Sequence, residues 1–190
     1  MTSALVSADA FAAGAPVAFI ATGLNFPDAL SGGPAAVRLG GPLLLTMPGS
    51  VPDAIAEELS RLQPGRIVVL GSHPTVTDEV AEILREFTTG EVTRLAGPSR
   101  YDTSALTSAA AFPAPVPVVY LATGHNFPDA LSGAPAAGVL GGPLLVTHPN
   151  RLSAEIAQEL RRLRPERIVI LGSHPTMSHR VHLELGQYLR

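Results

Sequence analysis

Short apolar runs rich in valine, isoleucine and leucine alternate along the chain with longer stretches in which apolar and polar residues follow a helical period. A continuous apolar run bounded by glycine or proline predicts a strand buried on both faces, and the amphipathic stretches between such runs predict crossover helices. This order predicts an α/β fold with parallel sheets. The predicted strands are 17–22, 42–46, 66–71, 92–96, 118–123, 143–147 and 167–172.

Several predicted helices carry start signals. Pro52 lies in the predicted first turn of the helix within 52–64, and the corresponding helix of the second half has Ser153 as its predicted N-cap. Thr77 is the predicted cap of a helix that extends to residue 87. The apolar positions of that helix are predicted to face the core, and they are Val80, Ile83, Leu84 and Phe87.

The chain is a tandem duplication. Residues 1–89 align with residues 102–190 without a gap, and more than half of the aligned positions are identical. Only the segment GEVTRLAGPSRY, residues 90–101, lacks a counterpart. The duplication therefore predicts two similar modules, the first of which lacks the strand that corresponds to 92–96.

The longest shared motif is ATGLNFPDALSG at 21–32, which returns as ATGHNFPDALSG at 122–133. Each copy follows a predicted strand, and ligands of open parallel sheets gather at that edge. Asn25 and Asp28 have the spacing of a capping box, and Pro27 suits the first helical turn. Two interpretations stay open: the motif shapes the start of a helix, or it also binds a ligand.

Three enzyme interpretations have weaker support. ALSGG around Ser31 approximates a nucleophile elbow, but the serine lies inside the predicted helix and the second copy loses the last glycine. His73 and His174 follow strands without a fixed acid or nucleophile nearby in the sequence. His179 and His182 share a helical face without a third ligand. Because no phosphate-loop or dinucleotide fingerprint is present either, we expect no catalysis, metal or cofactor.

Composition removes further classes of function. The formal net charge is -3 with no block of like charges, which disfavours nucleic-acid and membrane-surface binding. The sequence contains no cysteine, so disulfides and thiolate chemistry are excluded. The longest uncharged run, 103–128, carries three prolines near its middle, so no membrane insertion is predicted. The alanine-rich start recurs at 103–113 and is interpreted as part of the repeat rather than as a secretory leader.

Four ordered motifs, NFPDALSG, GGPLLLT, RIVVLG and RLAGPSRYDTSA, resemble the bacterial cell wall-binding repeat family of the second type. The resemblance covers nearly the whole chain. It implies tandem Rossmann-like three-layer modules that anchor a secreted protein to anionic polymers of the Gram-positive envelope, outside the cell. In the phase of that family, 91–190 is a complete repeat and 1–90 is a repeat without its opening strand. The family motif has aspartate where this sequence has Ser99.

The implied partners are a cell wall polysaccharide or a teichoic-acid-like polymer, and further copies of the same repeat. Arg100 and Tyr101 lie where a guanidinium can meet an anion beside helix N-terminal amides, or else cap carbonyls at a module seam. Each motif loop offers an amide and a phenylalanine face for a sugar ring, so we expect two weak sites that act together on one polymer. The expected polymer-binding residues are Asn25, Phe26, Asp28, Ser31, Arg100, Tyr101, Asn126, Phe127, Asp129 and Ser132.

Other interpretations stay open at this point. A small α/β enzyme or nucleotide-binding protein would use the same strand-end loops as a pocket, and a purely structural repeat would bind no polymer. An alternative binding surface consists of the arginines of the second half, Arg161, Arg162, Arg164 and Arg167.

Overall fold

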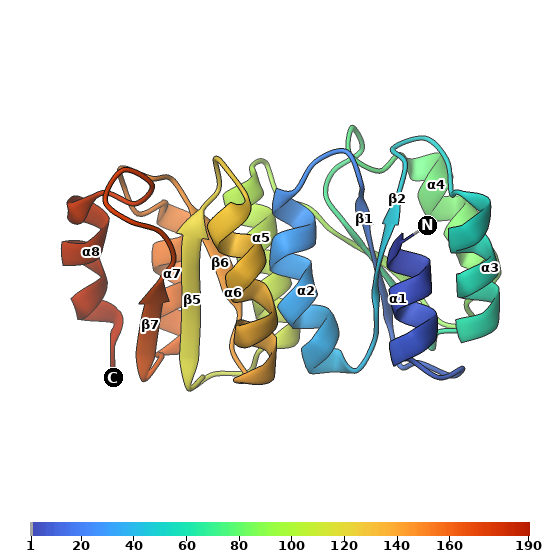
Figure 1. The fold of residues 1–190 in the computed structure, drawn as a ribbon, viewed down its shortest axis with the longest axis horizontal. Helices are drawn as coiled ribbons and strands as arrows, with labels where there is room; N and C mark the ends of the chain where they lie inside the picture. Colours follow the sequence, from blue (N-terminus) through green and yellow to red (C-terminus); the bar gives the residue numbers. More distant parts are fainter. Residues whose placement is uncertain (1) are drawn as a thin grey trace.

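The computed structural model describes residues 2–190. Two α/β modules lie side by side: module 1 comprises the elements from α1 to β4, and module 2 those from α5 onward (Figure 1). Module 1 has a four-stranded parallel sheet in the order β2-β1-β3-β4, and module 2 has a three-stranded parallel sheet in the order β6-β5-β7. The strands are β1 (Ala18–Thr22), β2 (Leu43–Thr46), β3 (Ile67–Leu70), β4 (Val92–Leu95), β5 (Val118–Thr123), β6 (Leu144–Thr147) and β7 (Arg167–Ile170).

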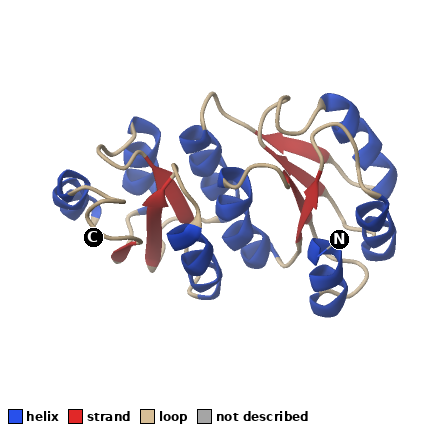
Figure 2. Cartoon of the chain, turned by 45° about the horizontal axis from the view of Figure 1, so that its top comes forward, coloured by secondary structure: helices blue, strands red, loops and turns tan. Residues whose placement is uncertain are grey.

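Helices connect successive strands and lie on both faces of each sheet (Figure 2). A short 3-10 turn follows the last helix of each half, at Arg85–Phe87 and Gly186–Tyr188. Within residues 2–190, no helix has the length and apolar character needed to cross a membrane. The α-helices are α1 (Thr2–Ala10), α2 (Pro27–Leu39), α3 (Asp53–Leu62), α4 (Asp78–Leu84), α5 (Arg100–Ala111), α6 (Pro128–Val139), α7 (Ala154–Leu163) and α8 (His179–Leu185).

The three-layer architecture follows from alternation along the strands. In module 1, Ala18 and Ile20 of β1 face a core made with α1, α3 and α4, whereas Phe19 and Ala21 face α2. Module 2 repeats the arrangement, with one face of its sheet packed against α5, α7 and α8 and the other against α6. The predicted fold class is therefore confirmed, and every predicted strand lies within two residues of its observed bounds.

Local start and stop signals are confirmed in part. The Thr77 hydroxyl accepts a hydrogen bond from the Val80 amide, as predicted for the cap of α4. Ser153 occupies the N-cap position of α7, but its hydroxyl accepts from the His148 amide rather than from the helix. Pro52 is the N-cap residue of α3 and not a first-turn residue.

Two details of the sequence interpretation are wrong. Ile83 is 41% exposed, because α4 is short and buries mainly Val80 and Leu84. The capping box predicted for α2 is absent: Phe26 is the N-cap residue, and the Asn25 side-chain oxygen accepts a hydrogen bond from the adjacent Phe26 amide at 3.0 Å. The Asp28 carboxylate instead packs against Gly71, where a Cβ atom would lie 2.5 Å from one of its oxygens.

The strand at 92–95 belongs to the first sheet. β4 pairs in parallel with β3, with Ile67 opposite Val92 and Leu70 opposite Leu95. Module 1 therefore has the additional strand, and module 2 is the one without it, which reverses the prediction from the duplication. The reason is that the segment following β3 folds back on the exposed edge of β3 before it enters α5. The division of the sequence into repeats at 1–90 and 91–190 stays a prediction.

The modules share a continuous core across their seam. α2 packs against both α5 and α6, and its Leu30 is buried among side chains of module 2 that include Tyr120 and Ala134. Gly138 of α6 permits this close approach, since a Cβ atom there would lie 3.3 Å from the Pro34 Cα atom of α2. We conclude that the two modules form one packed unit rather than two independently moving domains.

The same hydrogen-bonded cluster around a buried glutamate joins two helices in each module. Glu58 of α3 accepts hydrogen bonds from Ser7 of α1 and from Arg61, whose guanidinium also donates to the Phe11 carbonyl. In module 2 the corresponding residues, Ser108, Glu159, Arg162 and the Phe112 carbonyl, make the same contacts. Arg162 is thus engaged in structure, which makes it less available to a ligand.

Candidate binding surface at the module seam

Both motif loops lie at the carboxyl edge of their sheets and meet at the seam. β1 leads into the loop before α2, and β5 leads into the loop before α6. The rings of Phe26 and Phe127 lie 5.5 Å apart between centroids, tilted by 51°. A pair at this distance is an ordinary aromatic contact. The two loops therefore meet in one composite surface. The expectation of two weak sites that act together on one polymer stays a prediction.

An apolar hollow lies around this aromatic pair. Its volume is 280 Å³, and it reaches from the end of β1 to α6. Both phenylalanines and several leucines contribute side chains, so the hollow offers faces rather than hydrogen-bonding groups. Its lining is Thr22, Gly23, Leu24, Asn25, Phe26, Ala29, Leu30, Leu45, Phe127 and Leu131.

A smaller polar cleft lies on the other side of Asn25. It has a volume of 170 Å³ and brings together the start of α2, the loop after β3 and the start of α5. Asn25 lines both the hollow and the cleft, so a ligand that extends over Asn25 can touch both. The cleft is lined by Asn25, Pro27, Asp28, Gly71, Ser72, Thr75, Gly97, Pro98, Ser99, Arg100 and Thr103.

Asp28 is the buried acid of the cleft, with 9% of its surface exposed. Burial raises the pKa of its carboxyl above the ordinary value, because the charged form loses hydration, and the nearby Arg100 guanidinium partly opposes this rise. Gly71, with a φ of 94°, leaves the room that the carboxylate occupies. Asp28 therefore shapes the cleft and holds Arg100 electrostatically, and it offers little surface to a ligand.

Arg100 and Tyr101 begin α5 of module 2 and lie at the seam. The Arg100 guanidinium donates to the Gly124 carbonyl of its own module, while the Tyr101 ring packs against the cluster that contains Leu30 of module 1. Arg100 thus has the carbonyl-binding role that the sequence left open, and it also lines the polar cleft. Ser99 caps α5 through a capping box with Asp102, which is a role that serine fills as well as aspartate.

The motif serines and the remaining loop residues have different environments in the two modules. The Ser31 hydroxyl is buried and donates to the Pro27 carbonyl, so it is not placed as a nucleophile. Ser132 is exposed and donates to the Asp129 carbonyl. Asn126 is also exposed, and Asp129 packs against Gly172 as Asp28 does against Gly71. Module 2 thus repeats the contact between the motif aspartate and the glycine after the third strand.

The histidines considered as catalytic or metal-binding candidates lie at the surface. His73 Nδ1 lies 3.2 Å from the Asp78 carboxylate, and both side chains are exposed. His179 and His182 stack at the surface, and no group of three potential metal ligands occurs in the part of the chain that the structure describes.

His125 and His148 form a pair that no sequence motif indicates. Their rings lie 5.0 Å apart, edge to face, where module 1 has Leu24 and Met47. Partial burial lowers the pKa of His148, and Arg151 and His125 lower it further. Module 2 therefore presents a more polar rim than module 1 at equivalent positions.

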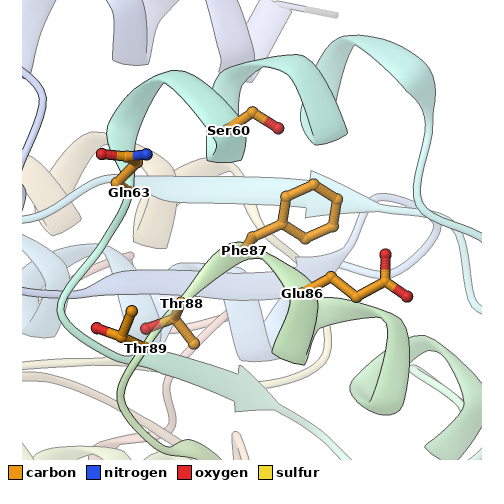
Figure 3. A pocket seen from close by; sticks show the side chains of 6 residues that line it. All are labelled: Ser60, Gln63, Glu86, Phe87, Thr88 and Thr89. Atoms are coloured by element: carbon orange, nitrogen blue, oxygen red, sulfur yellow. The ribbon is translucent and has the colours of Figure 1, made fainter.

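Another hollow of module 1 lies away from the motif loops. It has a volume of 430 Å³ and is formed by the end of α3 and the turn before β4, at the amino edge of the sheet (Figure 3). Module 2 fills the equivalent place, because Arg161 lies over the Tyr188 ring at 5.4 Å where module 1 has Ser60 and Phe87. The hollow thus results from the short side chain of Ser60 at the position of Arg161. Glu86 is the one charged residue in its lining.

Sequence reasoning identified most of the loop residues but missed the partners that complete the cleft. Gly71, Thr75 and Gly97 line it beside Asp28 and Arg100. The one available signal is that GSHPT occurs twice, at residues 71–75 and 172–176.

Comparison with known proteins supports the wall-binding resemblance. The model of the family Cell wall binding domain 2 (CWB2) matches residues 1–81 and 94–182. An amidase enhancer of Bacillus subtilis (strain 168) is 28% identical over 160 residues, covering 84% of this chain and 21% of that protein. The N-acetylmuramoyl-L-alanine amidase LytC of the same strain is 27% identical over 171 residues, covering 90% of this chain and 34% of that protein. The chain therefore spans only a part of each relative.

Solved structures share the fold over almost the whole chain. Cwp6 from Clostridium difficile superposes with a TM-score of 0.86 at 21% identity, over 98% of this chain and 29% of that one. Cwp8 from Clostridium difficile superposes with a TM-score of 0.81 at 25% identity, over 99% of this chain and 32% of that one. Two tandem Rossmann-like modules are thus a recurring arrangement.

Proposed function

Because this chain belongs to the Cell wall binding domain 2 family, we propose that it anchors a protein outside the cell by binding an anionic polymer of the bacterial wall through the seam surface. The single observation that carries the location is the meeting of both motif loops, with Phe26 and Phe127 at 5.5 Å. The proposed ligand is a wall polysaccharide or a teichoic-acid-like polymer, and no cofactor takes part. Further copies of the repeat are the second proposed class of partner.

The chemistry of the surface supports a polymer that is both saccharide and anion. The Phe26 and Phe127 faces in the apolar hollow suit sugar rings, which are apolar on their C–H faces. Asn25 can donate and accept hydrogen bonds, and Arg100 supplies a cation beside the amino end of α5. Asp28 lies too deep to repel a polyanion strongly.

The surface supports a non-catalytic role. The Ser31 hydroxyl is committed to backbone carbonyls of its own helix, and His73 is paired with Asp78 on the far side of the loop after β3. A nucleophile needs a base within hydrogen-bonding reach. These contacts favour binding over the runner-up functions, a small enzyme or a nucleotide-binding protein.

The first test is co-sedimentation of the purified chain with Gram-positive cell walls before and after hydrofluoric acid removes their secondary polymers. We expect binding to intact walls and loss of binding to stripped walls. Equal binding to stripped walls would point to peptidoglycan instead, and no binding to either would leave a purely structural role for the repeats.

The aromatic pair is tested by Phe26→Ala, Phe127→Ala and the double variant. We expect each single change to weaken wall binding about threefold to tenfold and the double change more than tenfold, because each ring contributes roughly 1 kcal/mol of contact. Leu183→Ala, at an exposed apolar residue on α8, is the matched control and should bind like the wild type. A double variant that keeps its melting temperature and its affinity would remove the hollow from the site.

The cation is tested by Arg100→Ala, with Arg180→Ala on α8 as the control for loss of one surface charge. We expect Arg100→Ala to lower affinity for the polymer about tenfold and to flatten its salt dependence, because a charged contact is lost. Arg180→Ala should change neither. Unchanged affinity together with a lowered melting temperature would assign Arg100 to the seam alone.

A further inference from the structure

The amino edge of the first sheet holds a hollow that lies outside the seam surface. It is bounded by the end of α3 and by the turn before β4, and its volume is 430 Å³ (Figure 3). This volume lies in the ordinary range of small-ligand pockets, about 300–1,000 Å³. We call it the amino-edge hollow, and its lining is Ser60, Gln63, Glu86, Phe87, Thr88 and Thr89.

Contacts between the two walls hold the amino-edge hollow in shape. The Thr88 hydroxyl of one wall donates to the Pro64 carbonyl of the other at 2.6 Å, and it accepts from the Gly90 amide at 3.1 Å. The two backbones also approach closely, since a Cβ atom on Gly90 would lie 1.9 Å from the Gly65 carbonyl oxygen. The hollow is therefore part of the folded framework, and a ligand that enters it has few groups to order.

Phe87 supplies an aromatic ring to the lining. The residue is half-buried, because it packs against the core that module 1 forms with α1, α3 and α4. A ring that the core already holds loses little freedom when a ligand covers its remaining surface. Aromatic faces suit the apolar C–H faces of sugar rings.

The polar side chains of the lining suit hydroxyl groups. Gln63 is the C-cap residue of α3, with a φ of 42°, so the helix end fixes where its side chain begins. Its amide donates and accepts, whereas the Glu86 carboxylate only accepts, and both residues are exposed. Hydrogen bonds from hydroxyls to a carboxylate are charge-assisted and strong. The lining thus combines an aromatic face with hydrogen-bonding groups for a polyhydroxy compound.

Module 2 has different residues at every position of this hollow. Glu58 and Arg61, on the same helix as Ser60, recur in module 2, and more than half of all aligned positions are identical. Arg161 fills the equivalent place by lying over the Tyr188 ring at 5.4 Å. The hollow is therefore specific to module 1. The six counterparts of its lining are Arg161, Arg164, Gln187, Tyr188, Leu189 and Arg190.

We propose that the amino-edge hollow binds an uncharged hexopyranose ring. Phe87 stacks on one face of the sugar, the Glu86 carboxylate accepts from neighbouring hydroxyls, and Gln63 donates and accepts at the rim. Because Glu86 is the one charged residue of the lining, the hollow disfavours sugars that carry a negative charge. The site lies at the opposite edge of the sheet from the seam surface, and it is independent of polymer binding there.

The test titrates the whole isotope-labelled chain with the methyl glycosides of glucose, galactose and mannose, and with the uronic acid counterpart of each. Amide chemical shifts in NMR spectra give the dissociation constant and locate the ligand. We expect saturable binding of at least one hexoside, with shifts centred on Gln63 and Phe87. The uronic acid counterpart of that hexoside should bind about threefold more weakly or worse, because its carboxylate meets Glu86.

Variants assign the binding to the hollow. Ser60→Arg introduces the arginine that fills this place in module 2 and should remove binding. Ser173→Arg, in the exposed loop after β7, is the matched control and should bind like the wild type. Phe87→Leu keeps an apolar side chain toward the core and should weaken binding about fivefold to tenfold, because stacking is lost. The double variant of Phe26→Ala and Phe127→Ala should bind the hexoside in the hollow unchanged, which separates this site from the seam surface.

The charge is tested by Glu86→Gln, which keeps the shape of the side chain. We expect hexoside binding to weaken about threefold, since a charged acceptor is lost, and the affinity of the uronic acid to approach that of the hexoside. Absence of binding to all three hexosides or shifts centred away from the hollow would overturn the proposal. So would a Ser60→Arg variant that binds like the wild type, or a Glu86→Gln variant that discriminates against the uronic acid as before.

Discussion

Two buried carboxylates in module 1 have opposite electrostatic environments. Glu58 is hydrogen-bonded by Arg61 and Ser7, and the Arg61 hydrogen bond chiefly lowers the pKa of its carboxyl. Burial raises the pKa of the Asp28 carboxyl, and no side chain donates a hydrogen bond to it among the described residues. The ionised form therefore stabilises the fold at Glu58 and costs stability at Asp28.

These environments predict opposite responses to substitution and pH. A carboxyl whose pKa is lower in the folded than in the unfolded protein stabilises the fold at pH values above its unfolded pKa. This stabilisation is lost as the pH falls through the pKa of the folded protein. Glu58→Gln should thus destabilise by about 1.5–3 kcal/mol at pH 7 and by less in acid. A raised pKa has the opposite effect, because the ionised carboxylate destabilises the folded protein. Asp28→Asn should therefore raise the free energy of unfolding at pH 7. The difference between variant and wild type should shrink as the pH falls and Asp28 becomes protonated. Urea unfolding of both variants from pH 3 to pH 8 measures this, and parallel pH profiles would contradict it.

At the scale of elements, the turn from α2 into β2 requires a close approach of backbones. Gly40 ends α2 with a φ of 76°, and a Cβ atom on Gly41 would lie 1.8 Å from the Val17 carbonyl oxygen. Gly141 and Gly142 repeat both features after α6. The paired glycines therefore fix where each crossover helix ends and where the next strand enters the sheet.

Glycine substitutions within α2 and its turn separate this requirement from helix propensity. Gly41→Ala should destabilise by about 2 kcal/mol or more, because the methyl group collides with fixed backbone. Gly33→Ala, inside α2 with no neighbour within 4 Å of the added atom, should stabilise by about 0.5–1 kcal/mol. Denaturant midpoints at a constant m-value provide the measurement. A similar loss of unfolding free energy in both variants would contradict a specific role of the turn.

At the scale of the molecule, the seam makes two equivalent residues unequal. Leu30 and Leu131 occupy the same position of the repeated motif, yet only Leu30 is covered by the neighbouring module. Leu30→Ala should cost about 2–5 kcal/mol of unfolding free energy, and Leu131→Ala less than about 0.5 kcal/mol. Thermal and urea unfolding of the two variants gives the comparison. Equal effects would show that the modules do not pack together in solution.

The sequence by itself determined the α/β class, the strand positions and the duplication, because local periodicity and glycine or proline punctuation encode them residue by residue. It also identified the family through motifs in a fixed order, and it selected Asn25, Phe26, Asp28 and Arg100 for the candidate surface. It could not show that these residues share one cleft, since the loops come from three separate stretches of chain.

Only the tertiary structure decided how identical segments are used. Backbone hydrogen bonds between strands are not specific to residue type, so nothing in the sequence of residues 92–95 states which sheet β4 joins. The seam places Phe26 against Phe127 and buries Leu30 while it leaves Leu131 exposed, although the motifs match. Burial depends on the neighbours that packing supplies, and two copies of one motif can have different neighbours.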